Sequence, residues 1–319
     1  MPELPEVEVV RRGVDQWAAG RRIQSVVVHD DRSLRRFTEG PEVFAQQLTD
    51  KVLGQSERRG KFLWIPLQDQ PQDSDPAELA LVIHLGMSGQ VLMENDDAPA
   101  EKHLKVTLNL EDRTTPEQPP EPLPNQLRFI DQRIFGGMQL SPLMPDAAAT
   151  GHQETELPEA GRLIPEVAIH IAPDPLEPVV TSEWFFQTLR RRRTGLKRAL
   201  LDQTVISGVG NIYADEALWL AGMHYARRSE TITRSQAGRL LQGLREVMEA
   251  ALAAGGTSFD SLYVNVNGAS GYFERSLEVY GRSGEACRRC QQPIRREKFM
   301  NRSSYFCPRC QPRPRNGRW

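Results

Sequence analysis

The sequence lacks any run of about 18 apolar residues, so we expect no membrane-spanning helix. Its first 20 residues also lack the basic start and the apolar core of a signal peptide, because they carry acids at Glu3, Glu6 and Glu8. No internal repeat is present. The mean hydropathy of −0.51 and the 39% of apolar residues are typical of a globular protein. We therefore expect a cytoplasmic protein that is neither secreted nor membrane-bound.

The net charge of −2 hides a strong asymmetry along the chain. Residues 1–178 carry 17 Lys and Arg against 30 Asp and Glu, a net charge of −13, whereas residues 179–319 carry 23 against 12, a net charge of +11. A basic half favours a polyanionic partner, because each cation placed near a phosphate releases a condensed counterion. A solvated basic face on an ordinary domain is the alternative that charge alone leaves open.

The length of 319 residues predicts two domains, with or without a small appendage, at roughly 100–200 residues per domain. Apolar residues at three- and four-residue spacing predict one N-terminal helix, from Pro5 to Trp17. Short β-rich runs follow it and predict a β-sandwich or barrel, and after Pro178 the spacing becomes helical. The β-rich runs are 23–28, 61–67, 79–85, 106–110 and 126–130, and the helical runs are 182–193, 196–201, 211–220 and 235–254.

Three acidic, proline-rich stretches interrupt these elements, at 68–78, 111–125 and 145–178. We expect the first two to be surface loops between strands. The third is expected to lead into an interdomain linker.

All four cysteines stand near the C-terminus, in the spacing C-x2-C-x16-C-x2-C. This spacing is typical of a zinc ribbon, in which two tight turns each present a pair of thiolates to one ion. Two disulfides are the alternative, but they need an oxidising compartment, of which the sequence gives no sign. Four thiolates leave no open coordination position, so we expect one structural zinc ion. Its ligands are Cys287, Cys290, Cys307 and Cys310.

The segment around these cysteines is basic, with 11 Lys and Arg against 2 Asp and Glu in residues 280–319. A small metal-stapled hairpin of this charge favours contact with DNA or RNA. A zinc ribbon that only closes the C-terminus is the alternative.

Five short motifs lie along the chain: MPELPEVE at 1–8, HLGMSG at 84–89, DQRIFG at 131–136, GVGNIYA at 208–214 and NRSSYFCPRCQ at 301–311. Together, from Pro2 to Gln311, they resemble the formamidopyrimidine-DNA glycosylase family. The resemblance implies a monomeric enzyme that excises oxidised purines, chiefly 8-oxoguanine and formamidopyrimidines, from double-stranded DNA and cleaves the strand by β,δ-elimination. It also implies a cytoplasmic, nucleoid-associated protein of prokaryotic type.

The resemblance further implies an α+β fold with an N-terminal β-sandwich and flanking helices. A helical helix-two-turn-helix domain and a four-cysteine zinc-ribbon hairpin would follow it. The expected domains are 1–178 for the catalytic sandwich, 179–275 for the helical DNA-binding domain and 276–319 for the zinc ribbon.

The N-terminus carries the candidate chemistry. If Met1 is removed, Pro2 presents a secondary amine with a pKa of about 8, which can attack the sugar C1′, displace the base and leave an iminium of Schiff-base type. Glu3 can act as general acid on the deoxyribose ring oxygen. Many chains begin with Met-Pro, and Glu3 also suits the start of a helix. The resemblance implies that both take these active roles, with Glu6 as a further acid nearby.

Two basic residues are implied to assist. Lys61 stands at the turn into a strand, and the resemblance makes it a contact to the phosphate next to the lesion. Arg302, on the zinc hairpin, is implied to grip phosphates and assist the elimination steps. Without the resemblance, a solvated hairpin lysine and a surface arginine would be the ordinary interpretations.

Further DNA contacts are implied along both halves. The turn before Asn211 exposes backbone amides at the positive end of a helix, where a phosphate can bind, although such turns are common. Arg192 and Lys197 lie in the basic stretch upstream of it, and His103 matches another DNA-contacting position. A lone histidine is more often an ordinary surface residue.

An enzyme that extrudes a base must fill the gap left behind. Met87 and Phe135 offer insertable apolar bulk, and Arg133 can bond the orphaned opposite base; the resemblance implies this gap-filling role. Met and Phe at strand ends otherwise belong to a core. The glycine-rich loop 257–272 is implied to close over the extruded base, although its glycines equally suit a disordered loop.

Two rival functions remain at this stage. One is an endonuclease VIII-like glycosylase for oxidised pyrimidines, which the motif at 1–8 and the gap-filling set disfavour. The other is a non-catalytic zinc-ribbon DNA-binding protein on the same scaffold. The acidic loops, the slightly acidic overall charge and Ile134, where a second arginine is frequent in the family, depart from the expected pattern and bear on affinity and opposite-base preference.

Overall fold

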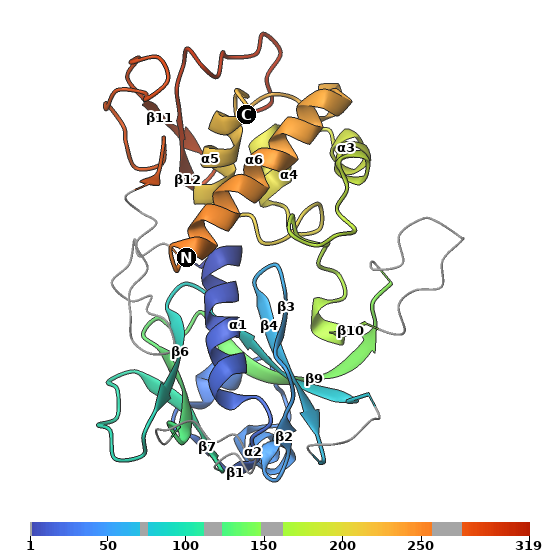
Figure 1. Cartoon of the computed structure of the whole chain (residues 1–319), viewed down its shortest axis with the longest axis vertical. Helices are drawn as coiled ribbons and strands as arrows, with labels where there is room; N and C mark the ends of the chain where they lie inside the picture. Colours follow the sequence, from blue (N-terminus) through green and yellow to red (C-terminus); the bar gives the residue numbers. More distant parts are fainter. Residues whose placement is uncertain (1, 71–75, 112–122, 148–161, 257–275) are drawn as a thin grey trace. The chain divides into compact units, whose positions relative to one another are not determined.

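The computed structural model describes residues 2–70, 76–111, 123–147, 162–256 and 276–319. They fall into two compact units, and each is described by itself. The first unit holds the described residues of Met1–Ala147, Leu157–Ile169 and Gly255–Tyr272, and the second those of Ala148–Glu156, His170–Ala254 and Phe273–Trp319. Figure 1 shows that strands dominate the first unit and that helices with a short hairpin make up the second. The predicted α+β class is confirmed.

Two antiparallel sheets build the first unit. One has the strand order β1-β7-β8-β6 and the other β10-β9-β5-β4-β2, with β3 paired to β4. Buried side chains of both sheets pack into one hydrophobic core, so the sheets form the predicted sandwich. The strands are β1 (Ile23–Val28), β2 (Val52–Leu53), β3 (Glu57–Arg59), β4 (Phe62–Gln68), β5 (Leu79–His84), β6 (Gly89–Glu94), β7 (Leu104–Leu110), β8 (Gln126–Asp131), β9 (Gly137–Pro145) and β10 (Leu163–Pro165).

Helix α1 (Leu4–Ala18) confirms the predicted N-terminal helix. It begins with a capping box, in which the backbone N–H of Glu3 donates to the Glu6 carboxylate at 2.9 Å. Its apolar face packs against the sandwich core. A second helix, α2 (Pro41–Leu48), was not predicted, although Pro41 at its start and the buried Phe44 are typical helix features.

Ion pairs fix one side of α1 to β3. The Glu8 carboxylate accepts hydrogen bonds from Arg11 Nε at 3.0 Å and Arg58 Nε at 3.1 Å. Burial by itself raises the pKa of Glu8, but the hydrogen bond from Arg11 and the charge of Arg58 outweigh it and lower the pKa to about 2. Since Arg58 lies just before the turn that carries Lys61, this pairing ties the β3–β4 hairpin to the first turns of α1.

The sequence patterns missed five strands of the first unit: β2, β3, β6, β9 and β10. Strand β9 contains Pro142 and ends at Pro145. Proline has no N–H to donate to a neighbouring strand, so a sequence pattern with two prolines argues against a strand. Strand β10 lies in the stretch that we expected to lead into a linker, yet it pairs with the end of β9, with Leu163 opposite Pro145. In the two acidic loops, residues 71–75 and 112–122 lie outside the described residues.

The second unit confirms the four predicted helical runs and the predicted C-terminal hairpin. Helix α5 is buried along most of its length and packs against α6. In the described part of the chain, no helix combines the length and the apolar character needed to cross a membrane. The elements are α3 (Ser182–Arg190), α4 (Leu196–Leu201), α5 (Asn211–Leu220), α6 (Arg234–Ala253), β11 (Arg295–Phe299) and β12 (Arg302–Phe306).

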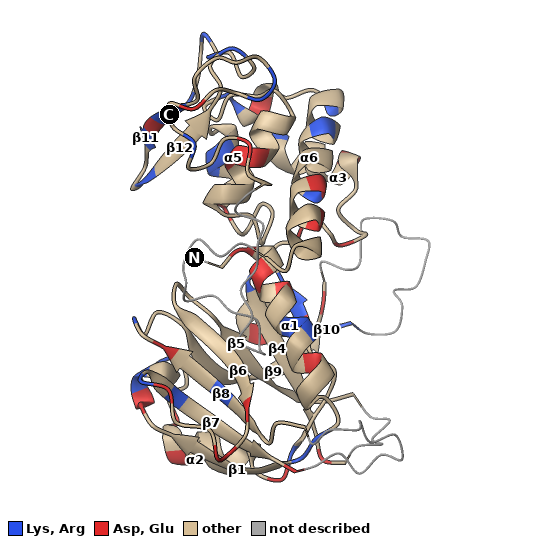
Figure 2. Ribbon diagram, turned by 60° about the vertical axis from the view of Figure 1, so that its left-hand side comes forward, with Lys and Arg blue, Asp and Glu red and all other residues tan. Residues whose placement is uncertain are grey.

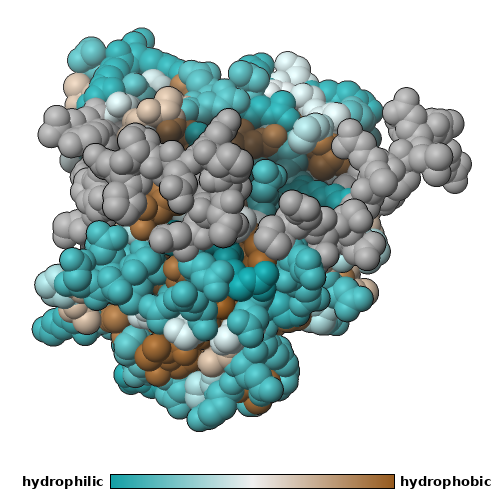
Figure 3. All heavy atoms as spheres, turned by 60° about the horizontal axis from the view of Figure 1, so that its bottom comes forward, coloured by the Kyte–Doolittle hydropathy of each residue, from teal (hydrophilic) through white to brown (hydrophobic). Residues whose placement is uncertain are grey.

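Hydrophilic residues cover most of the described surface in Figure 3, with hydrophobic residues in small patches. Figure 2 shows basic residues along the hairpin β11–β12 and charges of both signs on the helices of the same unit. The hairpin itself carries Arg295, Arg296, Lys298 and Arg302 against one acid, Glu297. This unit therefore presents the basic surface that the charge asymmetry predicted.

Arg59 on β3 and Asp146 just after β9 form an ion pair in which both side chains are almost fully buried. Replacing Asp146 with Ala leaves the Arg59 guanidinium in the interior without its carboxylate. We expect Asp146→Ala to lower the free energy of unfolding of the first unit by about 3–5 kcal/mol, measured by urea unfolding.

The control is Asp69→Ala, which breaks an exposed ion pair with Lys51 and should cost at most about 1 kcal/mol. Equal urea midpoints for the two variants would show that the buried pair contributes no more than a surface pair.

Candidate functional site

Strand register brings three candidate segments to one end of a sheet in the first unit. Phe62 at the start of β4 pairs with His84 at the end of β5, and His84 pairs with Gly137 at the start of β9. The turn that carries Lys61, the loop after β5 that carries Met87 and the loop before β9 that carries Arg133 and Phe135 therefore begin at neighbouring positions. Lys61, Met87 and the pair Arg133 and Phe135 come from three segments that are far apart in sequence. The strand register brings these segments together.

The two loops touch backbone to backbone. A Cβ added to Gly86, which has φ +61°, would lie 2.4 Å from the backbone N of Gly136. A Cβ added to Gly136 would lie 2.6 Å from the carbonyl oxygen of His84. Glycine at both positions lets the loops approach this closely, so Met87 is held beside the loop of Arg133 and Phe135.

The candidate gap-filling residues are exposed. Met87 is 38% and Phe135 50% exposed, and Arg133 also lies at the surface. The alternative that Met87 and Phe135 belong to the core is therefore wrong. Two exposed apolar side chains beside an arginine suit insertion into a base stack. Their apolar surface, which faces water in the free protein, would be buried between the bases on insertion.

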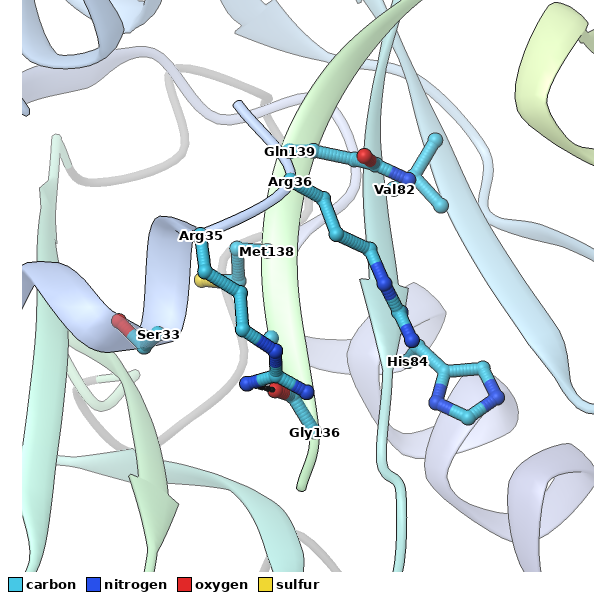
Figure 4. Close-up of a pocket in the computed structure, with 9 residues that line it drawn as sticks. Ser33, Arg35, Arg36, Val82, His84, Gly136, Met138 and Gln139 are labelled. Atoms are coloured by element: carbon cyan, nitrogen blue, oxygen red, sulfur yellow. Dashed lines mark hydrogen bonds between the residues drawn. The ribbon is translucent and has the colours of Figure 1, made fainter. Parts of the chain in front are cut away.

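His84, the first residue of the HLGMSG motif, lies in a distinct environment. Burial, followed by the charges of Arg36 and Lys61, lowers its pKa to about 4. Its Nδ1 accepts a hydrogen bond from the backbone N–H of Gly86 at 3.1 Å, so the neutral ring carries its proton on Nε2. Figure 4 shows the Arg36 side chain reaching to this ring. The sequence alone could not show that His84 is neutral, because its lowered pKa is caused mainly by burial in the fold.

The N-terminal candidates lie at the start of α1. Pro2 is buried, as are Glu3 at 3% and Glu6 at 7% exposure. Glu3 is the N-cap of the helix, which is the ordinary role that the sequence left open for it. His103 lies just before β7, and its carbonyl accepts the backbone N–H of Asp131 at 3.0 Å. This bond places His103 at the base of the loop that carries Arg133.

The four cysteines gather in the second unit. Their sulfurs all lie within 4.8 Å of one another, with Cys287 and Cys310 at 3.9 Å and Cys290 and Cys307 at 3.4 Å. A tetrahedral site with Zn–S bonds of about 2.3 Å has edges of about 3.8 Å, which these separations match. None of the four is in a disulfide, so that alternative is wrong.

Lys197 differs from our expectation. Its ammonium is completely buried and pairs with Asp215 at 2.8 Å. It also donates to the carbonyl of Ser303 at 3.0 Å and to the hydroxyl of Ser304 at 2.9 Å. An ammonium with these internal acceptors points into the protein and not to the surface. Instead, Lys197 fastens strand β12 to helices α4 and α5.

Asn211 binds the same Ser303 carbonyl as Lys197. It is the first residue of α5, and its Nδ2 donates to the carbonyl of Ser303 at 3.2 Å. Arg302, next to Ser303, is exposed, and Arg192, just after α3, is exposed as well. Both arginines lie at the surface, whereas Asn211 and Lys197 support the strand from which Arg302 projects.

Three family models match the chain. The formamidopyrimidine-DNA glycosylase N-terminal domain matches residues 1–138, its H2TH domain matches 171–262, and a zinc finger found in FPG and IleRS matches 284–313. Relatives named formamidopyrimidine-DNA glycosylase are 53% identical in Streptomyces coelicolor, over 99% of both chains, and 52% identical in Thermobifida fusca, over 100% of both. The chain belongs to the formamidopyrimidine-DNA glycosylase family. It is thus an enzyme of a DNA glycosylase family.

Solved structures of this family agree with the fold. The Lactococcus lactis Fpg in complex with DNA containing an abasic site is 29% identical and has a TM-score of 0.76, covering 98% of this chain and 100% of that one. A structure of MutM with DNA containing carbocyclic 8-oxo-G has the same identity, TM-score and coverage. The family match also identifies the four-cysteine cluster as a structural zinc centre. The loop 257–272 lies outside the described residues.

We expect Cys307→Ser to abolish zinc binding, because a serine hydroxyl is a poor ligand beside three thiolates. The zinc content of the purified protein should fall from one equivalent to none, and affinity for duplex DNA should fall with it. Arg288→Ala, an exposed residue between two ligands, should keep its zinc. Unchanged zinc content in Cys307→Ser would contradict the four-thiolate site.

The salt dependence of duplex binding separates Lys197 from Arg192. Arg192→Ala should lower the slope of log K against log salt by about 1, as expected when one phosphate contact is lost. Lys197→Met should leave the slope unchanged and instead destabilise the second unit by about 3–5 kcal/mol, because Asp215 is left buried without its partner. A lowered slope with normal stability in Lys197→Met would restore the direct phosphate contact.

Proposed function

We propose that this chain removes oxidised purines, chiefly 8-oxoguanine and formamidopyrimidines, from double-stranded DNA and then cleaves the strand by β,δ-elimination. Membership of the family supports the glycosylase reaction, and the MutM structure with 8-oxo-G DNA supports the choice of lesion. One observation carries the proposal: Met87, Arg133 and Phe135 form an exposed cluster on adjoining loops. An enzyme that extrudes a base from a duplex needs such a set to fill the gap.

The proposed reaction begins at the N-terminus. After removal of Met1, the amine of Pro2 attacks C1′, the bond from C1′ to the base breaks, and the base leaves with the bonding electron pair and takes up a proton. Glu3 protonates the ring oxygen, which opens the sugar and leaves an iminium on Pro2. Loss of a C2′ proton then expels the 3′ phosphate, and loss of the C4′ proton in a second elimination expels the 5′ phosphate. Water hydrolyses the remaining iminium, which releases the sugar fragment and frees the amine of Pro2. Glu6 is a further acid beside Glu3, and its carboxylate accepts the backbone N–H of Glu3.

The remaining site residues bind and orient the DNA in this proposal. Lys61 contacts the phosphate beside the lesion, and Arg302 grips phosphates from the zinc hairpin during elimination. Arg192, His103 and Asn211 supply further contacts. Zinc contributes no chemistry, because four thiolates close its coordination shell; it keeps the hairpin rigid.

Because the substrate is chromosomal DNA, we place the protein with the nucleoid in the bacterial cytoplasm. Each lesion requires one copy of the chemistry, so we expect a monomer.

The deciding experiment measures nicking of duplexes with 8-oxoguanine opposite cytosine or 5-hydroxyuracil opposite guanine, with borohydride in parallel tubes. We expect nicking and covalent trapping mainly on the 8-oxoguanine duplex, because the iminium is reducible. Preference for the pyrimidine lesion would indicate the endonuclease VIII-like function. Binding without nicking or trapping would indicate a non-catalytic DNA-binding protein.

The nucleophile can be tested with the chain as its own control. A removable N-terminal tag turns the nitrogen of Pro2 into an amide, so we expect no trapped adduct while duplex binding persists. Protease cleavage that leaves Pro2 as the first residue should restore trapping. Equal trapping before and after cleavage would show that another amine is the nucleophile.

A further inference from the structure

The loop between β8 and β9 displays Arg133 and Phe135 in an uncommon backbone conformation. Ile134, between them, has φ 55°, which is rare for a β-branched residue. Phe135 is half exposed, so its own packing does little to hold the loop. We call the Phe135 side chain the wedge, because it is the apolar group that would enter the base stack. A wedge must already be in position before DNA binds, since ordering it during binding would cost affinity. Something other than the side chains of this loop must therefore fix its backbone.

A buried carboxylate holds the N–H groups of the loop. Asp131 is fully buried and accepts the backbone N–H groups of Arg133 at 3.1 Å and Gly136 at 2.7 Å. The hydroxyl of Ser88, from the loop of Met87, donates to the same carboxylate. It also accepts the backbone N–H of Arg133 at 3.0 Å, so both loops share this anchor.

The carbonyl groups of the loop are held by a residue distant in sequence. Arg35, directly after the short 3-10 helix η1 (Asp31–Leu34), extends its guanidinium against the loop. It donates to the carbonyls of Ile134 at 2.7 Å, Phe135 at 2.9 Å and Gly136 at 3.0 Å. Figure 4 shows this side chain reaching from its segment to Gly136. Three consecutive carbonyls thus converge on one planar group.

We propose that Arg35 is a positioning residue that presets the loop of Arg133 and Phe135 for insertion into DNA. This inference rests on the proposed function, since it assigns Arg35 to the gap-filling step of that reaction. The guanidinium fixes the peptide groups on both sides of Phe135, which sets the direction in which the ring projects. Arg35 acts through these carbonyls and is not itself required to contact the base.

Arginine suits this task and lysine does not. The guanidinium has five N–H donors in a rigid plane and can reach several carbonyls at once, whereas an ammonium is a compact charge on a flexible stem. Arg35→Lys keeps the positive charge of the surface and removes only the fork. Any effect of this variant on DNA processing therefore reports geometry rather than electrostatic attraction.

The test compares Arg35→Lys with a matched control, Arg32→Lys. Arg32 lies on the same 3-10 helix, but its guanidinium binds Asp30. In single-turnover assays on duplex DNA, Arg35→Lys should excise 8-oxoguanine about tenfold more slowly, because the wedge is misplaced. It should also lose much of its preference between cytosine and adenine opposite the lesion. The control should match the wild type in both assays.

Borohydride trapping on single-stranded abasic DNA needs no gap-filling, since no partner base is left behind. Arg35→Lys should therefore trap this substrate within about twofold of the wild type. Equal losses on both substrates would show a general folding defect and overturn the positioning role. Absence of trapping in the wild type itself would instead refute the proposed function.

A double-mutant cycle with Phe135→Ala tests whether Arg35 works through the wedge. If it does, Arg35→Lys should slow duplex excision by less than about twofold once Phe135 is truncated, because there is no ring left to position. Fully multiplicative effects of the two substitutions would overturn the proposal, as would a wild-type excision rate in Arg35→Lys.

Discussion

Every buried backbone N–H group needs an acceptor, and at three places in this protein a buried carboxylate provides it. Asp131 accepts the amides of the loop that displays Arg133 and Phe135. In the second unit, Glu216 accepts three consecutive amides, from Glu278 to Tyr280, at 2.8–2.9 Å. Asp215 accepts the amide of Tyr305 on the zinc hairpin. The loop of Arg133 and Phe135 thus obtains a fixed shape without belonging to a sheet or helix, and Asp215 fastens the zinc hairpin to α5.

These carboxylates do not act alone, because a buried negative charge is costly unless it is paired or well hydrogen-bonded. Asp215 has Lys197 at 2.8 Å, and that ammonium in turn holds the carbonyl beside Arg302. Burial raises the pKa of Glu216, and its three amide hydrogen bonds act in the opposite direction because they favour the ionised form. The resulting pKa is about 7. The +11 charge of the C-terminal half is therefore not all available to a polyanion, since part of it neutralises internal acids.

Several elements could be predicted from sequence because their pattern is local. Helix α1 has apolar residues at helical spacing and an acidic first turn, and the zinc centre has its ligands in two tight C-x2-C pairs. Strand β9 was missed because Pro142 and Pro145 are unusual in strands, and its pairing with β5 and β10 cannot be seen in the sequence. The burial of Lys197 could not be predicted, because the sequence shows only a basic stretch, whereas the fold determines which of its cations face the solvent.

The amino-acid sequence is sufficient to identify the four-thiolate zinc site, the alternation of β-rich and helical regions, and the family, since each depends on residue types at fixed short spacing. Which distant residues act together depends on the tertiary structure. The register of β4, β5 and β9 brought Lys61, the loop of Met87 and the loop of Phe135 to one end of a sheet. The reach of Arg35 to three carbonyls about 100 residues away also depends on that packing, because contacts between distant segments leave no periodic trace in the chain.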